Sequence, residues 1–82
     1  MKDNPFLKQE FYLIQKSKDV ARFWSMDFFR RYDDGWTTII NAEKYLTEDD
    51  PKRVMEYMTF DCKEPSIFKD AVIKHGVIII NE

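Results

Sequence analysis

Cys62 and His75 are the side chains whose types most readily suggest catalysis, because a histidine can activate a thiol for nucleophilic attack. They are the only cysteine and the only histidine in the chain. A lone cysteine more often serves as a small buried apolar residue. We expect His75 to follow a helix, where the negative C-terminal end favours its protonated form. We therefore predict no catalytic residues and a non-enzymatic function.

Metal and cofactor sites are not predicted either. One cysteine and one histidine are too few for a tetrahedral zinc site, and the acidic residues lack the spacing of a calcium loop. The two glycines, Gly35 and Gly76, stand alone and far apart, so the chain contains no glycine-rich phosphate loop. The sequence therefore predicts a protein that works without a cofactor.

Acidic side chains gather in two places, at residues 33–34 and 48–50. The first group is expected in a turn and the second before a helix, where local structure accounts for most of their placement. An acidic patch also suits a basic partner surface, such as the nucleic-acid groove of an enzyme. With one apolar anchor, the predicted partner-binding residues are Phe29, Asp33, Asp34, Glu48, Asp49 and Asp50.

Composition limits the class of protein further. The 82 residues predict a single domain, residues 1–82, and 44% hydrophobic residues indicate a folded one. Thirteen Lys and Arg against fifteen Asp and Glu give a formal net charge of −2, which argues against direct nucleic-acid binding. No run approaches eighteen apolar residues, so no membrane contact is predicted. A single cysteine allows no internal disulfide and is typical of a reducing cytoplasm.

The stretch FWSMDFFRRYDDGW, residues 23–36, places six aromatic side chains around a single glycine. A helix here would be apolar on two sides. We interpret the stretch as a β-hairpin with residues 33–35 as its loop and Gly35 in the left-handed conformation. This register predicts three cross-strand pairs on one face, namely Tyr32 with Trp36, Phe28 with Ile40, and Met26 with Ala42.

The remaining elements follow from propensity and capping signals. Residues 10–16 favour a strand, with a helix from Pro5 as the alternative. A helix is expected from residues 49–51 to about Thr59, with Val54, Tyr57 and Met58 inward. A second helix is expected from residue 64 to a Gly76 cap. Residues 77–80 then predict a strand covered on both faces. The predicted fold is α+β, with a small, mostly antiparallel sheet of three or four strands packed on two helices.

The aromatic residues exceed what one side of such a sheet can bury. Phe23 and Phe29 fall on the hairpin face opposite Trp24, and one layer of helices covers one face of a sheet. Aromatic residues are enriched at protein interfaces. We therefore expect the second face to bind a partner, or a second copy of the chain in a homodimer.

A Gly-Trp-Thr stretch is followed by isoleucine, alanine and tyrosine at set distances: the positions are Gly35, Trp36, Thr37, Ile39 or Ile40, Ala42 and Tyr45. With these positions, residues 11–58 resemble a pattern found in small, uncharacterised bacteriophage accessory proteins. The resemblance implies a fold and a phage setting, and none of its positions is catalytic. The tail IFKDAVIKHGVIII is similar to the last helix and strand of minimal nucleotidyltransferases, although their Gly-Ser and paired Asp motif is absent.

The sequence thus predicts a small cytoplasmic protein that binds and modulates another macromolecule. An inhibitor of a host enzyme or defence system, of the kind that phages encode, fits the resemblance. A self-associating structural or antitoxin-like module is the alternative, and a nucleotidyltransferase-like remnant is a third interpretation.

Overall fold

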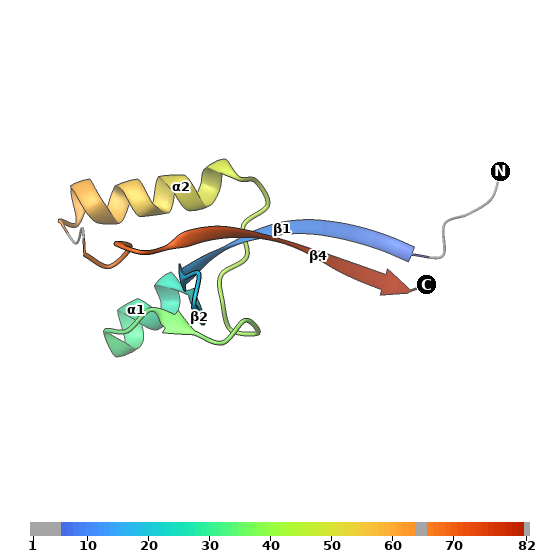
Figure 1. The fold of residues 1–82 in the computed structure, drawn as a ribbon, viewed down its shortest axis with the longest axis horizontal. Helices are drawn as coiled ribbons and strands as arrows, with labels where there is room; N and C mark the ends of the chain where they lie inside the picture. The colour runs from blue at the N-terminus through green and yellow to red at the C-terminus, as the bar shows by residue number, and fades with distance from the viewer. Residues whose placement is uncertain (1–5, 64–65, 82) are drawn as a thin grey trace.

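The computed structural model describes residues 6–63 and 66–81, and Figure 1 shows how its elements are arranged. One antiparallel sheet has the strand order β3-β2-β1-β4, and two helices accompany it, so the predicted α+β fold is confirmed. In chain order the elements are β1 (Phe6–Ser17), β2 (Val20–Trp24), α1 (Met26–Tyr32), β3 (Trp36–Thr37), α2 (Asp49–Glu56), a π-helical extension η1 (Tyr57–Asp61), and β4 (Val72–Asn81).

The strand predicted for residues 10–16 is confirmed as part of β1, so the alternative helix is wrong there. β1 turns back into β2 through residues 18–19, with Ser17 opposite Val20. From Phe11 to Gln15 the strand is almost entirely buried, because elements cover both of its faces. This buried segment of β1 is the centre of the fold.

The aromatic stretch at residues 23–36 is not a hairpin, and its three predicted cross-strand pairs are wrong. β2 ends at Trp24, and Ser25 caps a helix by accepting a hydrogen bond from the Phe28 amide at 3.3 Å. The chain returns after the helix, so that Trp24 lies opposite Trp36 in the short strand β3. A helix has therefore replaced most of the first arm of the predicted hairpin.

Because α1 begins after Trp24, it avoids the two-sided apolar pattern that disfavours a longer helix. Met26 and Phe29 pack against the core on its inner side. The rings of Phe28 and Tyr32 pack edge to face, with their centroids 5.2 Å apart, and Tyr32 is 63% exposed. A capped, seven-residue helix can thus place these aromatic residues without a second buried face.

Gly35 does not adopt the left-handed conformation predicted for it. The left-handed residue is Asp33, with φ 61°, and its amide donates to the carbonyl of Phe29 to close α1. Gly35 is buried against the ring of Trp24, and a Cβ atom at this position would overlap that ring. The glycine is therefore required for space.

The core has two parts, one on each face of β1. The helices cover the first part, and the loop between β3 and α2 covers the second, so Phe23 is buried and not on an open face as predicted. The first part contains Ile14, Trp24, Tyr45, Met58 and Phe68. The second contains Phe11, Leu13, Phe23 and Ala42.

The helix predicted for residues 64–76 is wrong. Residues 66–70 form turns, and Val72 begins a strand that pairs with β1 over ten positions, from Gln15 out to Phe6. Residues 64–65 lie outside the described residues. The β-branched residues of this segment suit a strand, and a long partner strand outweighs the local helical spacing. Gly76 is consequently mid-strand, opposite Phe11, and caps no helix.

The helix predicted from residues 49–51 to Thr59 is largely confirmed. α2 covers residues 49–56, and its π-helical extension continues it to residue 61. Val54 and Met58 pack inward as predicted, whereas Tyr57 is half-exposed. The helix begins after Glu48, whose side chain makes no capping hydrogen bond, so the predicted Asp N-cap is wrong.

The outer parts of β1 and β4, residues 6–10 and 77–81, form a two-stranded arm that extends beyond the other elements (Figure 1). The predicted strand at residues 77–80 is confirmed, but its predicted burial on both faces is wrong. Val77, Ile78 and Ile79 are 44%, 40% and 58% exposed. They are exposed because α1 and α2 pack against the body of the molecule, residues 11–63 and 66–76, and not against the arm.

We predict that Gly76→Ala lowers the free energy of unfolding by about 1–3 kcal/mol, the usual cost of overpacking. A Cβ atom at Gly76 would overlap the ring of Phe11 at the base of the arm. Urea unfolding measures this cost. Phe11→Leu removes the ring, so Gly76→Ala should cost less in that background. An equal cost in both backgrounds would show that the ring contact does not constrain this position.

Candidate functional site

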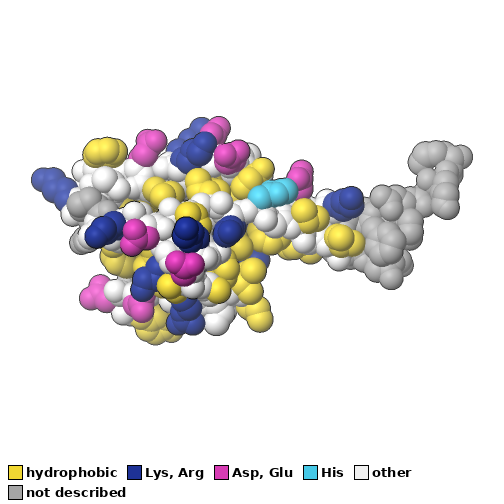
Figure 2. Space-filling model, in the orientation of Figure 1, with side chains coloured by type: hydrophobic (Ala, Val, Ile, Leu, Met, Phe, Trp, Pro, Cys, Tyr) yellow, Lys and Arg dark blue, Asp and Glu magenta, His cyan; other side chains and the backbone are white. Residues whose placement is uncertain are grey.

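One face of the arm carries a groove that both apolar and charged side chains line. In the β1–β4 ladder Lys8 lies opposite Ile79 and Glu10 opposite Val77, so these four side chains share a face. With Leu46 they line a groove of about 560 Å³. Figure 2 shows hydrophobic atoms along the arm beyond the single histidine. Exposed apolar side chains with charged side chains beside them are typical of a protein interface.

His75 stands at the base of the groove, on the same face. Its ring lies 5.0 Å from that of Tyr12, its partner in the ladder. Its Nε2 atom is 3.0 Å from Glu10 Oε1, with both side chains well exposed. Solvent-exposed pairs of this kind contribute little stability. The contact therefore serves to orient Glu10 toward the base of the arm, leaving Val77 and Ile79 uncovered.

The loop between β3 and α2 brings Leu46 to this groove. Tyr45 makes two backbone hydrogen bonds with Tyr12, at 2.7 and 2.9 Å, and so occupies the edge of β1 beyond the end of β2. Burial raises the pKa of the Tyr45 phenol, and the nearby carboxylate of Glu43 raises it further. Leu46, the next residue, is 68% exposed beside the arm.

The opposite face of the arm is simpler. Ile78 lies there opposite Gln9, next to the pair formed by Phe11 and Gly76. The Phe11 ring covers the glycine and closes the core at this point. Ile78 is the exposed apolar side chain on this face of β4 within the described part of the arm. The groove and Ile78 therefore point in opposite directions.

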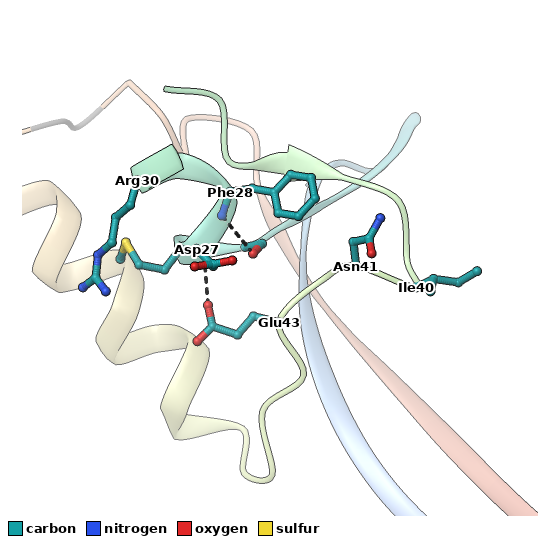
Figure 3. A pocket seen from close by; sticks show the side chains of 8 residues that line it. Asp27, Phe28, Arg30, Ile40, Asn41 and Glu43 are labelled. Carbon is teal, nitrogen blue, oxygen red and sulfur yellow. Dashed lines mark hydrogen bonds between the residues drawn. The ribbon is translucent and has the colours of Figure 1, made fainter. Parts of the chain in front are cut away.

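A second hollow, of about 680 Å³, lies at the start of α1 (Figure 3). Ser25 and Glu43 line it, but both side chains already bind the helix start. Ser25 Oγ accepts from the Phe28 amide, and Glu43 Oε1 accepts from the Met26 amide at 3.0 Å. These polar groups are engaged in holding α1, which makes the hollow a weaker candidate than the arm.

The acidic residues predicted to bind a partner do not form one surface. Asp33 and Asp34 follow α1, whereas residues 48–50 begin α2 at a different end of the body (Figure 1). Asp34 Oδ1 accepts from the Trp36 amide at 3.1 Å, so it closes the turn into β3. Two acids of the second group form ion pairs with cations of α2 itself. Glu48 Oε1 lies 3.5 Å from Lys52 Nζ, and Asp50 Oδ1 lies 3.7 Å from Arg53 Nη1. Asp49 is exposed in the first turn of α2.

Phe29 was predicted to point away from the core, and this is wrong. It lies on α1 and is half-buried, with its ring centroid 5.4 Å from that of Trp24. The error follows from the hairpin interpretation, because a strand sends alternate residues to opposite faces. On the helix, Phe29 and Met26 share the inward side.

Cys62 and His75 are not paired in the structure. Cys62 is exposed after η1, and a hydrogen bond with its thiol raises the pKa of the Tyr57 phenol. His75 is in the middle of β4 beside Glu10, and not at a helix end as predicted. Among residues 6–63 and 66–81, no three His, Cys, Asp or Glu side chains are grouped as metal ligands would be. None of the helices in these ranges has the length and apolarity to cross a membrane.

The groove residues Leu46, Val77 and Ile79 were missed as candidate site residues. An unbroken apolar run normally indicates burial on both faces, and Leu46 gives no signal on its own. The available signal was the lack of any charge or proline between residues 76 and 80, because edge strands usually carry such protection.

Comparisons with known proteins identify no relative of this chain. No protein-family model matches it, and searches of curated proteins and of solved structures return no match. The resemblance of residues 11–58 to phage accessory proteins therefore stays a prediction.

We predict that Phe29→Ala lowers the free energy of unfolding by about 2–4 kcal/mol, because it removes a ring that packs on Trp24. Tyr32→Ala on the same helix is the control, with an expected loss below about 1 kcal/mol, since Tyr32 is mostly exposed. Thermal unfolding compares them. An unchanged melting temperature for Phe29→Ala would return Phe29 to the list of interface residues.

Proposed function

We propose that this chain is a non-catalytic protein-binding module that modulates its partner, and that the arm is its contact site. The observation that carries this proposal is the exposure of Val77, Ile79 and Leu46, which line one groove on the same face of a two-stranded ribbon. Contiguous exposed apolar side chains on a small protein typically mark an interaction surface. A ribbon of two strands is also marginally stable by itself, so a partner that covers it would stabilise it.

The chemistry of the groove defines the class of partner. Three of its side chains are apolar, and its two charged side chains, Lys8 and Glu10, have opposite signs. Nucleic acid would require a basic surface, which this groove does not provide. A partner protein that packs one or two apolar side chains on Val77, Ile79 or Leu46 fits better, with polar contacts to Lys8 and Glu10. The predicted acidic residues do not form one surface that could bind a basic groove. The arm is therefore the better candidate for the contact site.

Inhibition of the partner, as the phage resemblance implies, is the form of modulation that we propose. An exposed free thiol at Cys62 suits a reducing compartment, so we place this action in the cytoplasm. Self-association is the second candidate function, and the edge of β4 favours it.

The proposed function predicts that Leu46→Lys weakens partner binding by about 2 kcal/mol, or roughly 30-fold, as expected for loss of an interface anchor. The folded chain and its variants serve as bait in a bacterial lysate, and proteins retained by each are compared. Thermal unfolding should be nearly unchanged, because Leu46 is already exposed.

Ile40→Lys is the matched control. Ile40 is 84% exposed and lines the second hollow, beside α1. A partner that binds the arm should be retained by the wild type and by Ile40→Lys but released from Leu46→Lys. Loss from Ile40→Lys alone would place the contact site at the second hollow. Equal retention by all three baits would remove the arm groove as the binding site.

A further inference from the structure

The outer edge of β4 is the longest free strand edge that the described residues contain. β4 is the last strand in the sheet order, and its ten residues pair on one side only, with β1. Unpaired edges are usually protected by charge, proline or a bulge. From Gly76 to Ile80 the chain has no charged residue and no proline, and its pairing with β1 has no bulge. Val77, Ile78 and Ile79 are exposed. Such an edge is a template for another strand.

The hydrogen bonds of β1 determine which groups of β4 face outward. The amide and carbonyl of Tyr12 bind Tyr45, on the side away from β4. Successive residues of a strand direct these groups to alternate sides, so Phe11 directs its groups to Gly76. It follows that Val77 and Ile79 direct their amide and carbonyl groups to the free edge. The two amide donors and two carbonyl acceptors of these residues are therefore available to a new strand.

We propose, building on the role of the arm as a binding site, that β4 pairs antiparallel with β4 of a second copy of this chain. A two-fold axis through Ile78 places Val77 of one copy opposite Ile79 of the other, and Ile78 opposite Ile78. All three central pairs are then apolar and β-branched, which is favourable across a sheet. Val77 and Ile79 form hydrogen-bonded pairs in this register, as their outward groups require.

The neighbouring symmetric registers are less favourable. Moving the axis to Val77 places Ile79 opposite His75 of the second copy. Moving it to Ile79 places Val77 opposite Asn81 and shortens the overlap by two residues on each strand. The register centred on Ile78 combines apolar pairing with an overlap of residues 75–81 from both copies. Self-complementarity of this kind is what a two-fold interface requires, and it selects a second copy over an unrelated strand.

The dimer would join the two sheets into one of eight strands and bring the two grooves onto one side. Val77 and Ile79 of both copies would then form one continuous apolar surface, larger than either groove alone. Pairing of two short strand segments is a small interface, so we expect the dimer to dissociate on dilution. A partner protein would contact the shared surface without displacing the edge pairing.

Disulfide trapping tests the register directly. In the proposed dimer, Ile78 and its copy form a non-hydrogen-bonded pair, with Cα atoms about 4.5 Å apart, which a disulfide can span. Ile78→Cys in a Cys62→Ser background should therefore cross-link with oxidised glutathione. Gln9→Cys in the same background is the control, because the two Gln9 residues would lie three strand spacings apart, about 14 Å. We expect cross-linking roughly tenfold faster or more for Ile78→Cys. Equal rates would overturn the proposal.

Sedimentation equilibrium over a hundredfold concentration range supplies the second measurement. The wild type and Ile40→Lys should shift from monomer to dimer, whereas Ile78→Lys should stay monomeric, since it places two lysines face to face. Circular dichroism verifies that Ile78→Lys is folded. A wild type that is monomeric throughout, or a dimer that survives Ile78→Lys, would refute the β4 pairing.

The two proposals fail separately because Ile78 and Leu46 lie on different faces. A monomeric wild type that still loses its partner with Leu46→Lys refutes the dimer and supports the binding function. A dimer that depends on Ile78, with no protein released by Leu46→Lys, supports the pairing and refutes the binding function.

Discussion

Burial of the Trp24 indole is the constraint on which the rest of the body depends. The side chain is fully buried, and its ring centroid lies 4.9 Å from that of Phe68 and 5.4 Å from those of Phe29 and Trp36. These three partners come from the turn before β4, from α1 and from β3. A large aromatic side chain can stabilise a small domain by removing on the order of 150–250 Å² from water. One ring thus contacts side chains from three separate parts of the chain.

That burial also explains two costs in the structure. The Nε1 atom of Trp24 is buried without a hydrogen-bond partner among residues 6–63 and 66–81, and an unpaired buried donor costs about 1–3 kcal/mol. The ring fills the space beside Gly35, so no side chain fits there. The chain tolerates both because the ring is the centre of the larger core. Ser25 then begins α1 directly after Trp24, since continuing β2 would carry the chain away from the ring.

Local patterns predicted the elements whose contacts are themselves local or repetitive. Strand propensity identified β1, and the Asp-Asp-Pro segment indicated the start of α2. The prediction for the aromatic stretch was wrong because both the helical and the strand period fit its apolar residues. The choice between them depended on Trp24 packing against distant residues such as Phe68. The helix expected before Gly76 failed because pairing with β1, some sixty residues earlier, outweighed helical spacing. The binding site was missed for a related reason, since apolar sequence alone cannot distinguish a buried strand from an exposed one.

The apolar residues of the body and those of the arm have different physical explanations. Every large apolar side chain of the inner part of β1 is covered by α1, α2 or the loop after β3, so folding of one chain explains these residues. Folding does not explain the arm, because Val77, Ile78 and Ile79 stay largely exposed within the same chain. A solvent-facing ribbon would be served by threonine, which keeps strand propensity, and by charged residues, which protect the edge. The β-branched apolar run of β4 instead fits a strand that completes its burial against another chain.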